Sequence, residues 1–503
     1  MSIRNRLLRG STTEVAVSVT EIIIGFIMMP FLMRTLGEHY YGMWLIIGTI
    51  LGYFQLLNFG FSSATQRYLT KYKAQNDLEG INQVLSNATL IFSVSGVVAL
   101  GFTLLIWYLP QFFIDDVKDL ATLKVIVLLI GVKIALTFPS YGFSGLIVAN
   151  LRQDIRNLIT ISTLIIRTAA IFTWVSKSED IIYLALITCI ADLICVASTV
   201  AYAISLQPGL VIRRAYLNKK GIKELFHYSA FSFLIWLSDQ LRFSVDNLVI
   251  AANLSLSAIT IYAIPVRLVT MANQVLLSLL SMLTPLLTLH HAAGNTEILK
   301  RDLQRALEFS MCIGFTLGGG LILLGESFVT LWIGHSYPEI STLLYIFAFI
   351  TILGTVQSPM IAYLYAVNKH SFYAALNIFD GVANLVLSLL LVRYIGLFGV
   401  ALGTVLPMLI TKIFIQPVYV CNLLAINKKS FYFLFFKGFF WLFFCSVSLK
   451  WLIVKYNVQI TSWWQFIAAG SVLAVFLLFG FYHLLISKHS KQQLLVLLFS
   501  KKK

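Results

Sequence analysis

The chain has 503 residues, of which 59% are hydrophobic and 12% are charged. Soluble domains are nearer half apolar and one quarter charged, so this composition excludes a water-soluble enzyme, a soluble nucleic-acid binder and a disordered regulator. The formal net charge of +16 would indicate nucleic acid in a soluble protein, but here it has to be explained within a membrane protein.

Apolar stretches long enough to cross a bilayer occur fourteen times along the chain. A bilayer core requires about 20 mostly apolar residues per helix, whereas the strands of a membrane barrel are about half as long and alternate in polarity. We therefore predict an all-α integral membrane protein with about 14 transmembrane helices, the first of them retained rather than cleaved as a signal peptide. The predicted spans are residues 13–34, 41–63, 84–108, 121–149, 157–176, 181–205, 225–252, 258–288, 306–333, 340–366, 372–393, 396–425, 431–454 and 462–486.

The basic residues are distributed unequally between the two sides of the membrane. If the N-terminus is cytoplasmic, 24 of the 37 Lys and Arg residues fall in inside segments, 6 in outside segments and 7 within spans. Cytoplasmic loops carry the excess of Lys and Arg in membrane proteins. The distribution predicts cytoplasmic N- and C-termini and an even number of spans.

An internal repeat divides the chain. Tyr41 and Tyr262 occupy similar patterns at an offset of 221 residues, and Asn76 and Asn295 do so at an offset of 219. Chance similarity between apolar helices is the alternative explanation. Six spans separate the repeats, so both cross the membrane in the same direction, as in transporters built from parallel repeats. The predicted organisation is an N-lobe (1–205), a basic cytoplasmic linker (206–224), a C-lobe (225–425), and two further helices with a basic tail (426–503).

Two sequence blocks carry a family resemblance. The turn Leu36-Gly37-Glu-His-Tyr-Tyr41-Gly42 and the block Asp246-Asn247-Leu-Val-Ile…Tyr262-Ala-Ile-Pro265-Val-Arg267…Pro285…Gly294-Asn295 resemble those of the multidrug/oligosaccharidyl-lipid/polysaccharide (MOP) exporter superfamily, and among its branches the Wzx-type polysaccharide flippases of bacteria. The resemblance covers most of the chain, to about the twelfth span. It implies two pseudo-symmetric six-helix lobes in a MATE-like V shape around a cavity, with two added C-terminal helices.

The same resemblance implies a function and a location. The expected activity is transfer of an undecaprenyl-diphosphate-linked oligosaccharide from the cytoplasmic to the periplasmic leaflet of the bacterial inner membrane. The product would serve surface polysaccharide synthesis, such as lipopolysaccharide O-antigen or capsule. Alternating access, driven as in an antiporter by H⁺ or Na⁺, is the expected mechanism. The expected partners are this substrate, membrane lipids and polysaccharide polymerase machinery, with no nucleic acid; the protein is expected to be a monomer.

Charges inside the spans are the candidate site. A charge at the bilayer centre costs about 2.5–3.5 kcal/mol on insertion scales, so it normally faces a cavity or a partner. Asp239, Arg242 and Asp246 share one helical face at spacings of three and four residues. Internal salt bridges, for example between Arg242 and either acid, are the structural alternative, and Arg167, Asp192 and Asp380 carry less weight. The predicted substrate-binding cations are Arg242, Arg267, Lys133 and Lys412, with Glu21, Asp239 and Asp246 as coupling or charge-partner residues.

Two other functions compete with the flippase. A cation-coupled multidrug exporter would require a mostly acidic, apolar cavity, and a polysaccharide polymerase or acyltransferase would require catalytic groups at a membrane face. No such catalytic spacing and no nucleotide-binding loop of the Walker type is visible, so no enzyme is predicted. The five cysteines form no CxxC pair and the histidines have no metal-ligand spacing, so no metal or cofactor is expected.

Overall fold

The computed structural model describes residues 3–110, 117–226, 229, 233, 245–280, 283–335, 337–487 and 491. These residues are almost all helical and contain no strand. Twelve described helices are long and apolar enough to cross a membrane. The prediction of an all-α membrane protein is therefore confirmed, while the count of fourteen stays a prediction.

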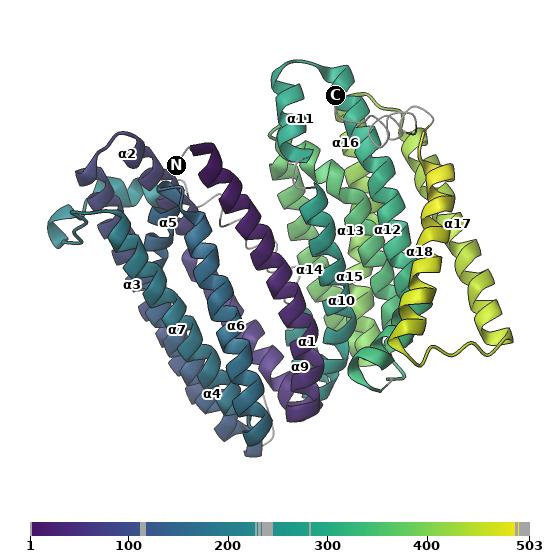
Figure 1. Cartoon of the computed structure of the whole chain (residues 1–503), viewed down its shortest axis with the longest axis horizontal. Coiled ribbons are helices and arrows are strands. Elements are labelled where there is room, and N and C mark those ends of the chain that lie inside the picture. Colours follow the sequence, from purple (N-terminus) through teal and green to yellow (C-terminus); the bar gives the residue numbers. More distant parts are fainter. Residues whose placement is uncertain are drawn as a thin grey trace. The chain divides into compact units, whose positions relative to one another are not determined.

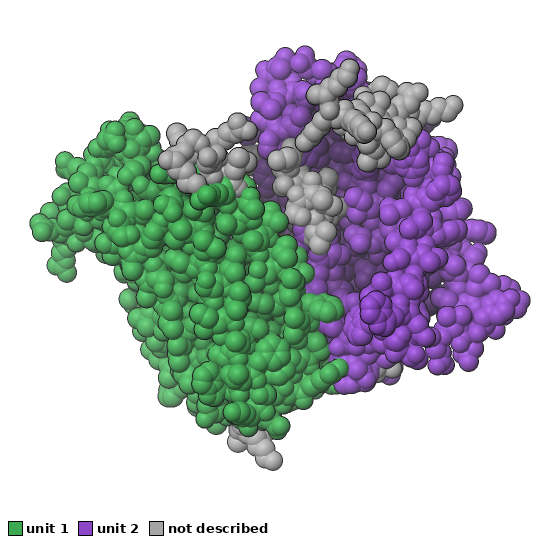
Figure 2. Space-filling view, in the orientation of Figure 1, with its two compact units in different colours: residues 1–260 green, residues 261–503 purple. Residues whose placement is uncertain are grey.

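Two compact units divide the chain, residues 1–260 and 261–503 (Figure 2). Within each unit the long helices run side by side (Figure 1). Unit 1 contains α1 (Ile3–Gly52), α2 (Phe61–Ala74), α3 (Leu78–Tyr108), α4 (Val117–Thr137), α5 (Tyr141–Ala149), α6 (Gln153–Ser178), α7 (Ile181–Leu206) and α9 (Val245–Asn253). The helix α10 (Leu256–Leu280) begins in unit 1 and continues into unit 2.

Unit 2 holds the remaining helices. They are α11 (Leu283–Ala292), α12 (Thr296–Ile333), α13 (Ile340–Ala366), α14 (His370–Ile395), α15 (Leu397–Leu409), a π-helix (Ile410–Ile415), α16 (Gln416–Leu424), α17 (Lys428–Lys455) and α18 (Trp463–Leu485). Phe315 of α12 stacks on Phe481 of α18 at 5.5 Å and lies 5.6 Å from Phe435 of α17. The last two helices therefore pack directly on α12.

Each predicted span except the seventh overlaps a helix that is long and apolar enough to cross a membrane. The first two predicted spans lie largely within α1, in two helices that meet at a kink at Gly37. The seventh, residues 225–252, lies mostly outside the described residues, with α9 at its end. Arg242 and Asp239 are outside the described residues as well.

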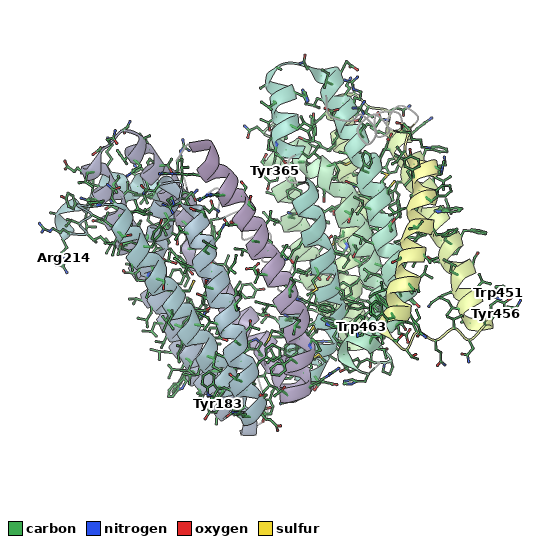
Figure 3. The ribbon with its side chains drawn as sticks, viewed as in Figure 1. Tyr183, Arg214, Tyr365, Trp451, Tyr456 and Trp463 are labelled. Carbon is green, nitrogen blue, oxygen red and sulfur yellow. The ribbon has the colours of Figure 1, made fainter. Side chains whose placement is uncertain are left out.

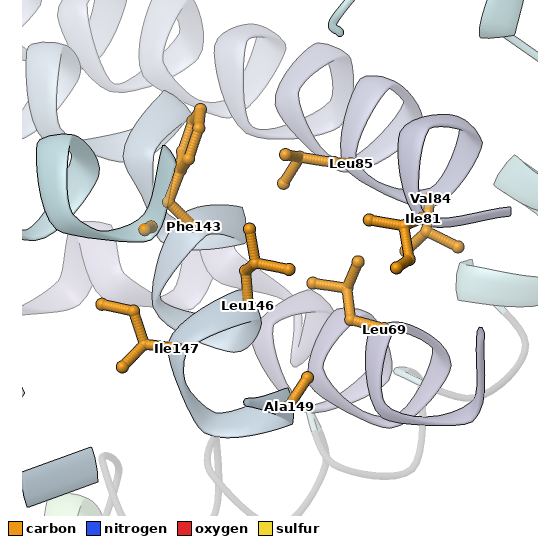
Figure 4. Packing of buried hydrophobic residues seen from close by; sticks show 9 residues of the cluster. Leu69, Ile81, Val84, Leu85, Phe143, Leu146, Ile147 and Ala149 are labelled. Carbon is orange, nitrogen blue, oxygen red and sulfur yellow. The ribbon is translucent and has the colours of Figure 1, made fainter. Parts of the chain in front are cut away.

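The core of unit 1 at the α2 end is a cluster of buried aliphatic residues from four helices. Leu69 of α2, Leu85 of α3, and Leu146 and Ile147 of α5 are fully buried (Figure 4). Ala203 of α7 completes the cluster. Burying each such side chain stabilises the fold by roughly 1.5–3 kcal/mol, which fixes the short helices α2 and α5 against the long α3 and α7.

Two glycines explain the turn that carries the family resemblance. Gly37 has φ 80° and ψ 166°, a conformation that glycine adopts without steric cost, and the chain bends there. A methyl group at Gly42 would lie 1.9 Å from the carbonyl oxygen of Leu256 at the start of α10. In the same junction, the hydroxyl of Thr260 donates to the carbonyl of Glu38 at 2.6 Å. Only glycine at position 42 allows α1 and α10 to approach so closely.

Replacing Gly42 with alanine is expected to destabilise the protein by about 1–3 kcal/mol, because the new methyl group meets backbone rather than a movable side chain. Gly48 on the same helix is the matched control, since a methyl group there has nothing within 4 Å. Gly48→Ala is expected to be neutral or to stabilise the helix by about 0.5–1 kcal/mol. Thermal unfolding of the detergent-purified proteins measures both, and equal stability of the two variants would contradict this account of the junction.

Candidate substrate-binding site

One carboxylate in unit 1 holds two cations from neighbouring helices. The ammonium of Lys133 on α4 lies 2.8 Å from Asp192 Oδ2 on α7. The guanidinium of Arg167 on α6 lies 3.3 Å from the other oxygen, Asp192 Oδ1. We call these three residues the unit 1 cluster. Its formal charge is +1, because two cations share one acid.

The unit 1 cluster is only partly buried. The exposed fractions of its side chains are 16% for Lys133, 26% for Arg167 and 29% for Asp192. A guanidinium has five N–H donors, and the hydrogen bond to Asp192 uses one of those on Arg167. The cluster thus retains donors and positive charge that an incoming anion can use.

A second cluster lies in unit 2 and is closed to solvent. Lys412, within the π-helix, has its ammonium 3.3 Å from Asp380 Oδ2 on α14, and the two side chains are 2% and 1% exposed. The ammonium also donates to Asn377 Oδ1 at 3.3 Å and to Gln416 Oε1 at 3.4 Å. The hydroxyl of Thr411 donates to Asp380 Oδ1 at 2.7 Å. This unit 2 cluster, Lys412 and Asp380 with their polar neighbours, is an internal neutral ion pair.

The two clusters occupy corresponding helices of the two repeats. Asp192 and Lys412 are 220 residues apart, which matches the offset of the sequence repeat. The unit 1 cluster draws its residues from α4, α6 and α7. The unit 2 cluster draws Asp380 from α14 and Lys412 from the helix after it, while Gln357 of α13 donates to the Lys412 carbonyl. The polarity is reversed, because the last helix supplies the acid in unit 1 and the cation in unit 2.

The other predicted residues that the structure describes lie outside the two clusters. Asp246 is buried in the first turn of α9, and the amide of the adjacent Asn247 donates to the Thr49 hydroxyl at 2.9 Å. Arg267 is half-buried on α10 and Glu21 is exposed on α1. Among the residues that the structure describes, neither Arg267 nor Glu21 forms an ion pair.

Sequence reasoning gave less weight to Asp192 and Asp380, which pair directly with the predicted lysines, and to Arg167, which pairs with Asp192. It did not single out Asn377 or Gln357 at all. A usable signal was present, since applying the repeat offset to Asp192 leads to Lys412. The pairing across helices had no signal in the local sequence.

An apolar pocket of about 320 Å³ lies within unit 2, between α10, α12 and α18. Its walls include Leu268 of α10, Leu321 and Phe328 of α12, and Phe466 and Leu473 of α18. The pocket offers an apolar chain a place among helices. In the described part of the chain, no group of three or more His, Cys, Asp or Glu residues is arranged to hold a metal ion.

Comparison with known proteins identifies a family and a relative of this chain. Residues 7–290 match the family model described as "Polysaccharide biosynthesis protein". The chain is 25% identical over 499 residues to the uncharacterized membrane protein EpsK of Bacillus subtilis (strain 168), covering 95% of this chain and 94% of the relative.

Solved structures share the fold. The lipid II flippase MurJ in an inward closed conformation superposes with a TM-score of 0.68 at 15% identity, covering 94% of this chain and 98% of that chain. An inward-facing multidrug resistance MATE transporter of the MOP superfamily gives a TM-score of 0.64 at 13% identity, covering 81% of this chain and 94% of that chain. These similarities, at 13–15% identity, show that the chain shares the fold of these two proteins.

Proposed function

Because the chain belongs to the polysaccharide biosynthesis protein family, we propose that it is a flippase for an undecaprenyl-diphosphate-linked oligosaccharide. The substrate moves from the cytoplasmic to the outer leaflet of the bacterial inner membrane, where surface polysaccharide such as O-antigen or capsule is assembled. The two repeats alternate access to the two sides, and both termini are cytoplasmic. That the chain is a multi-pass membrane protein with a transporter and flippase fold does not depend on the identity of this substrate.

The unit 1 cluster is the observation that carries the proposal. A diphosphate is a compact anion that guanidinium groups bind through paired N–H donors and ammonium groups bind as point charges. Lys133 and Arg167 supply one group of each kind, and their shared acid leaves a net positive charge. Partial exposure allows the phosphate oxygens to reach these donors. The unit 2 cluster is neutral and closed, so it fits an internal ion pair that stabilises its unit.

The apolar pocket in unit 2 supports a lipid-linked rather than a soluble substrate. Burying an apolar polyprenyl chain among apolar side chains leaves no polar group without a hydrogen-bond partner. The pocket wall, with Leu268, Leu321 and Phe328, provides a surface for such burial. An apolar pocket among helices suits the polyprenyl half of the proposed substrate.

The main competing function, export of organic cations, fits the unit 1 cluster poorly. A site of net charge +1 repels a cation, and like-charge juxtaposition costs several kcal/mol when desolvated. The fold shared with a multidrug transporter shows the architecture alone. We therefore place this activity second.

Alanine at both Arg242 and Arg267 is expected to abolish surface polysaccharide while the protein level stays normal. Each charge-assisted hydrogen bond that is lost removes about 1.5–3 kcal/mol, so export falls roughly tenfold to hundredfold per residue. Lys437 is the matched control, because it is a span cation on α17 whose ammonium lies 5.9 Å from the Phe433 ring. Lys437→Ala is expected to export normally.

Surface polysaccharide is measured by immunoblot in a strain that lacks the chromosomal gene. Unchanged export by the double variant would exclude both arginines from diphosphate binding. Transport by the wild type in proteoliposomes, with and without an imposed H⁺ or Na⁺ gradient, tests the ion coupling proposed for Glu21 and Asp246. Equal transport rates with and without each gradient would show that Glu21 and Asp246 do not couple transport to ions.

A further inference from the structure

The basic segment between the repeats is docked on unit 1. The backbone N–H of Val211 donates to Asn82 Oδ1 at 3.1 Å, and that of Asn218 donates to Asn87 Oδ1 at 3.0 Å. Both asparagines lie on α3 and are buried. The ammonium of Lys73 on α2 donates to Gln207 Oε1 at 2.7 Å. Residues 207–226, the docked linker, therefore form a fixed surface of unit 1.

The length of α3 places the docked linker at the edge of the bilayer. With 31 residues, α3 rises about 46 Å, whereas the hydrocarbon core is about 30 Å thick. Trp107 and Tyr108 at its C-terminal end are exposed, as aromatic residues are at membrane interfaces. A helix crosses the hydrocarbon core of a bilayer in about 20 residues. Counting that length from Tyr108 toward the N-terminus of α3 places the other edge of the core near residue 88. Asn82 and Asn87, and the linker bonded to them, therefore lie at the head-group level.

The exposed side chains of α3 support the placement of Asn82 and Asn87 at the head-group level. Its large exposed apolar residues between Leu90 and Leu105 form the lipid-facing band, whose members are Leu90, Val94, Val97, Val98, Phe102, Leu104 and Leu105. In unit 1, Tyr183 lies at one end of the helices and Arg214 of the linker lies at the other (Figure 3). The linker and the aromatic residues therefore mark opposite edges of the apolar layer.

The docked linker combines exposed cations with exposed apolar side chains. It contains five basic residues and one acidic residue, Glu224. All five are exposed: Arg213, Arg214, Lys219, Lys220 and Lys223. Ile212, Leu217 and Phe226 beside them are 43%, 37% and 53% exposed. This combination is typical of segments that lie in the membrane interface.

A polar pocket of about 170 Å³ opens between the docked linker and unit 1. Its polar lining consists of Tyr68 and Tyr72 of α2, Gln83 and Asn87 of α3, and Asn218, Lys220 and Glu224 of the linker. Amide, phenol and ammonium groups are donors that suit the oxygens of a phosphodiester. The pocket lies at the level where phospholipid phosphates lie.

We propose that the docked linker and its pocket form a binding site for anionic phospholipid head groups of the surrounding membrane. The exposed apolar side chains favour a lipid over a soluble phosphate, because only a lipid brings an acyl region beside them. Basic residues near an anionic surface each strengthen binding by about fivefold. This site is independent of which substrate the protein transports.

The test compares the full-length protein with a variant that lacks four of these charges, R213Q/R214Q/K219Q/K220Q. The proteins are purified in a non-ionic detergent and supplied with phosphatidylglycerol or phosphatidylcholine. Native mass spectrometry and thermal unfolding measure bound lipid and stabilisation. The wild type is expected to prefer phosphatidylglycerol and to be stabilised by it, and the variant is expected to lose roughly tenfold or more of that preference.

A matched control removes four exposed or half-buried cations from unit 2, K300Q/R301Q/K428Q/K429Q, and is expected to keep the preference. Equal loss in the control would show a general charge effect and overturn the site. Retention of the preference by the linker variant would overturn it too. Inorganic phosphate or glycerol phosphate is expected to give no stabilisation, and stabilisation as large as that from phosphatidylglycerol would identify a soluble anion as the ligand instead.

A variant that releases the docked linker from α3 tests whether the position of the linker, apart from its charge, is needed for lipid binding. The N82A/N87A variant keeps every cation but removes the two amide groups that bind the linker backbone. The proposal expects it to show a reduced preference for phosphatidylglycerol. A full preference in this variant would overturn the requirement for a linker held on α3.

Discussion

Glutamine at both Lys133 and Arg167 is expected to abolish export of the lipid-linked oligosaccharide. The change removes the two cations of the unit 1 cluster and leaves Asp192, whose negative charge repels a diphosphate. Charge-assisted hydrogen bonds contribute about 1.5–3 kcal/mol each, so the double variant loses between two and four orders of magnitude in transport. Surface polysaccharide and transport in proteoliposomes measure the effect.

Two further variants separate substrate binding from folding. The triple variant K133Q/R167Q/D192N has no charge in the cluster, so it relieves the unpaired acid. It is expected to regain a normal protein level and still not export. Asp192→Asn keeps both cations and is expected to export. Recovery of export by the triple variant would show that the cluster is only an ion pair between helices.

Methionine at Lys412 is expected to destabilise the protein by about 3–5 kcal/mol, the usual cost of removing one partner from a buried ion pair. Asp380 is 1% exposed and would have to stay charged without its cation or take up a proton. The hydroxyl of Thr411 would be left as its remaining described hydrogen-bond donor. Thermal unfolding in detergent and the amount of protein in the membrane measure the loss.

The double variant D380N/K412M is the control for this experiment. Asparagine still accepts the Thr411 hydrogen bond and carries no charge, so most of the stability is expected to return. A structural role predicts that the double variant also exports. If it is stable but does not export, Lys412 contacts the substrate, as its position within a predicted span first indicated. If Lys412→Met alone is as stable as the wild type, the ion pair makes no net contribution.

Much of the fold could be predicted from the sequence. The spans were located because a helix in lipid must satisfy its backbone internally and present an apolar surface for about 20 residues. The kink at Gly37 and the close approach at Gly42 lie in the turn that carries the family resemblance. The turn predicted between the first two spans corresponds to the kink at Gly37, where two helices within α1 meet.

The surroundings of the candidate residues could not be predicted from the sequence. Lys133 and Lys412 are equivalent in sequence, as single lysines within apolar helices. The structure makes them different, because Lys133 shares a partly buried acid with Arg167, while Lys412 is enclosed with Asp380. The partners come from helices 25 to 59 residues away along the chain in unit 1, where no local pattern links them.

The sequence by itself determined that this is a helical membrane protein, and it predicts two repeats with a basic linker between them. Apolar length and charge are properties of consecutive residues, so they can be read along the chain. Only the tertiary structure decided which intramembrane charges are neutralised and enclosed and which keep positive charge within reach of a ligand. The physical reason is that burial and ion pairing depend on which helices are neighbours, and the packing of the whole unit sets those neighbours.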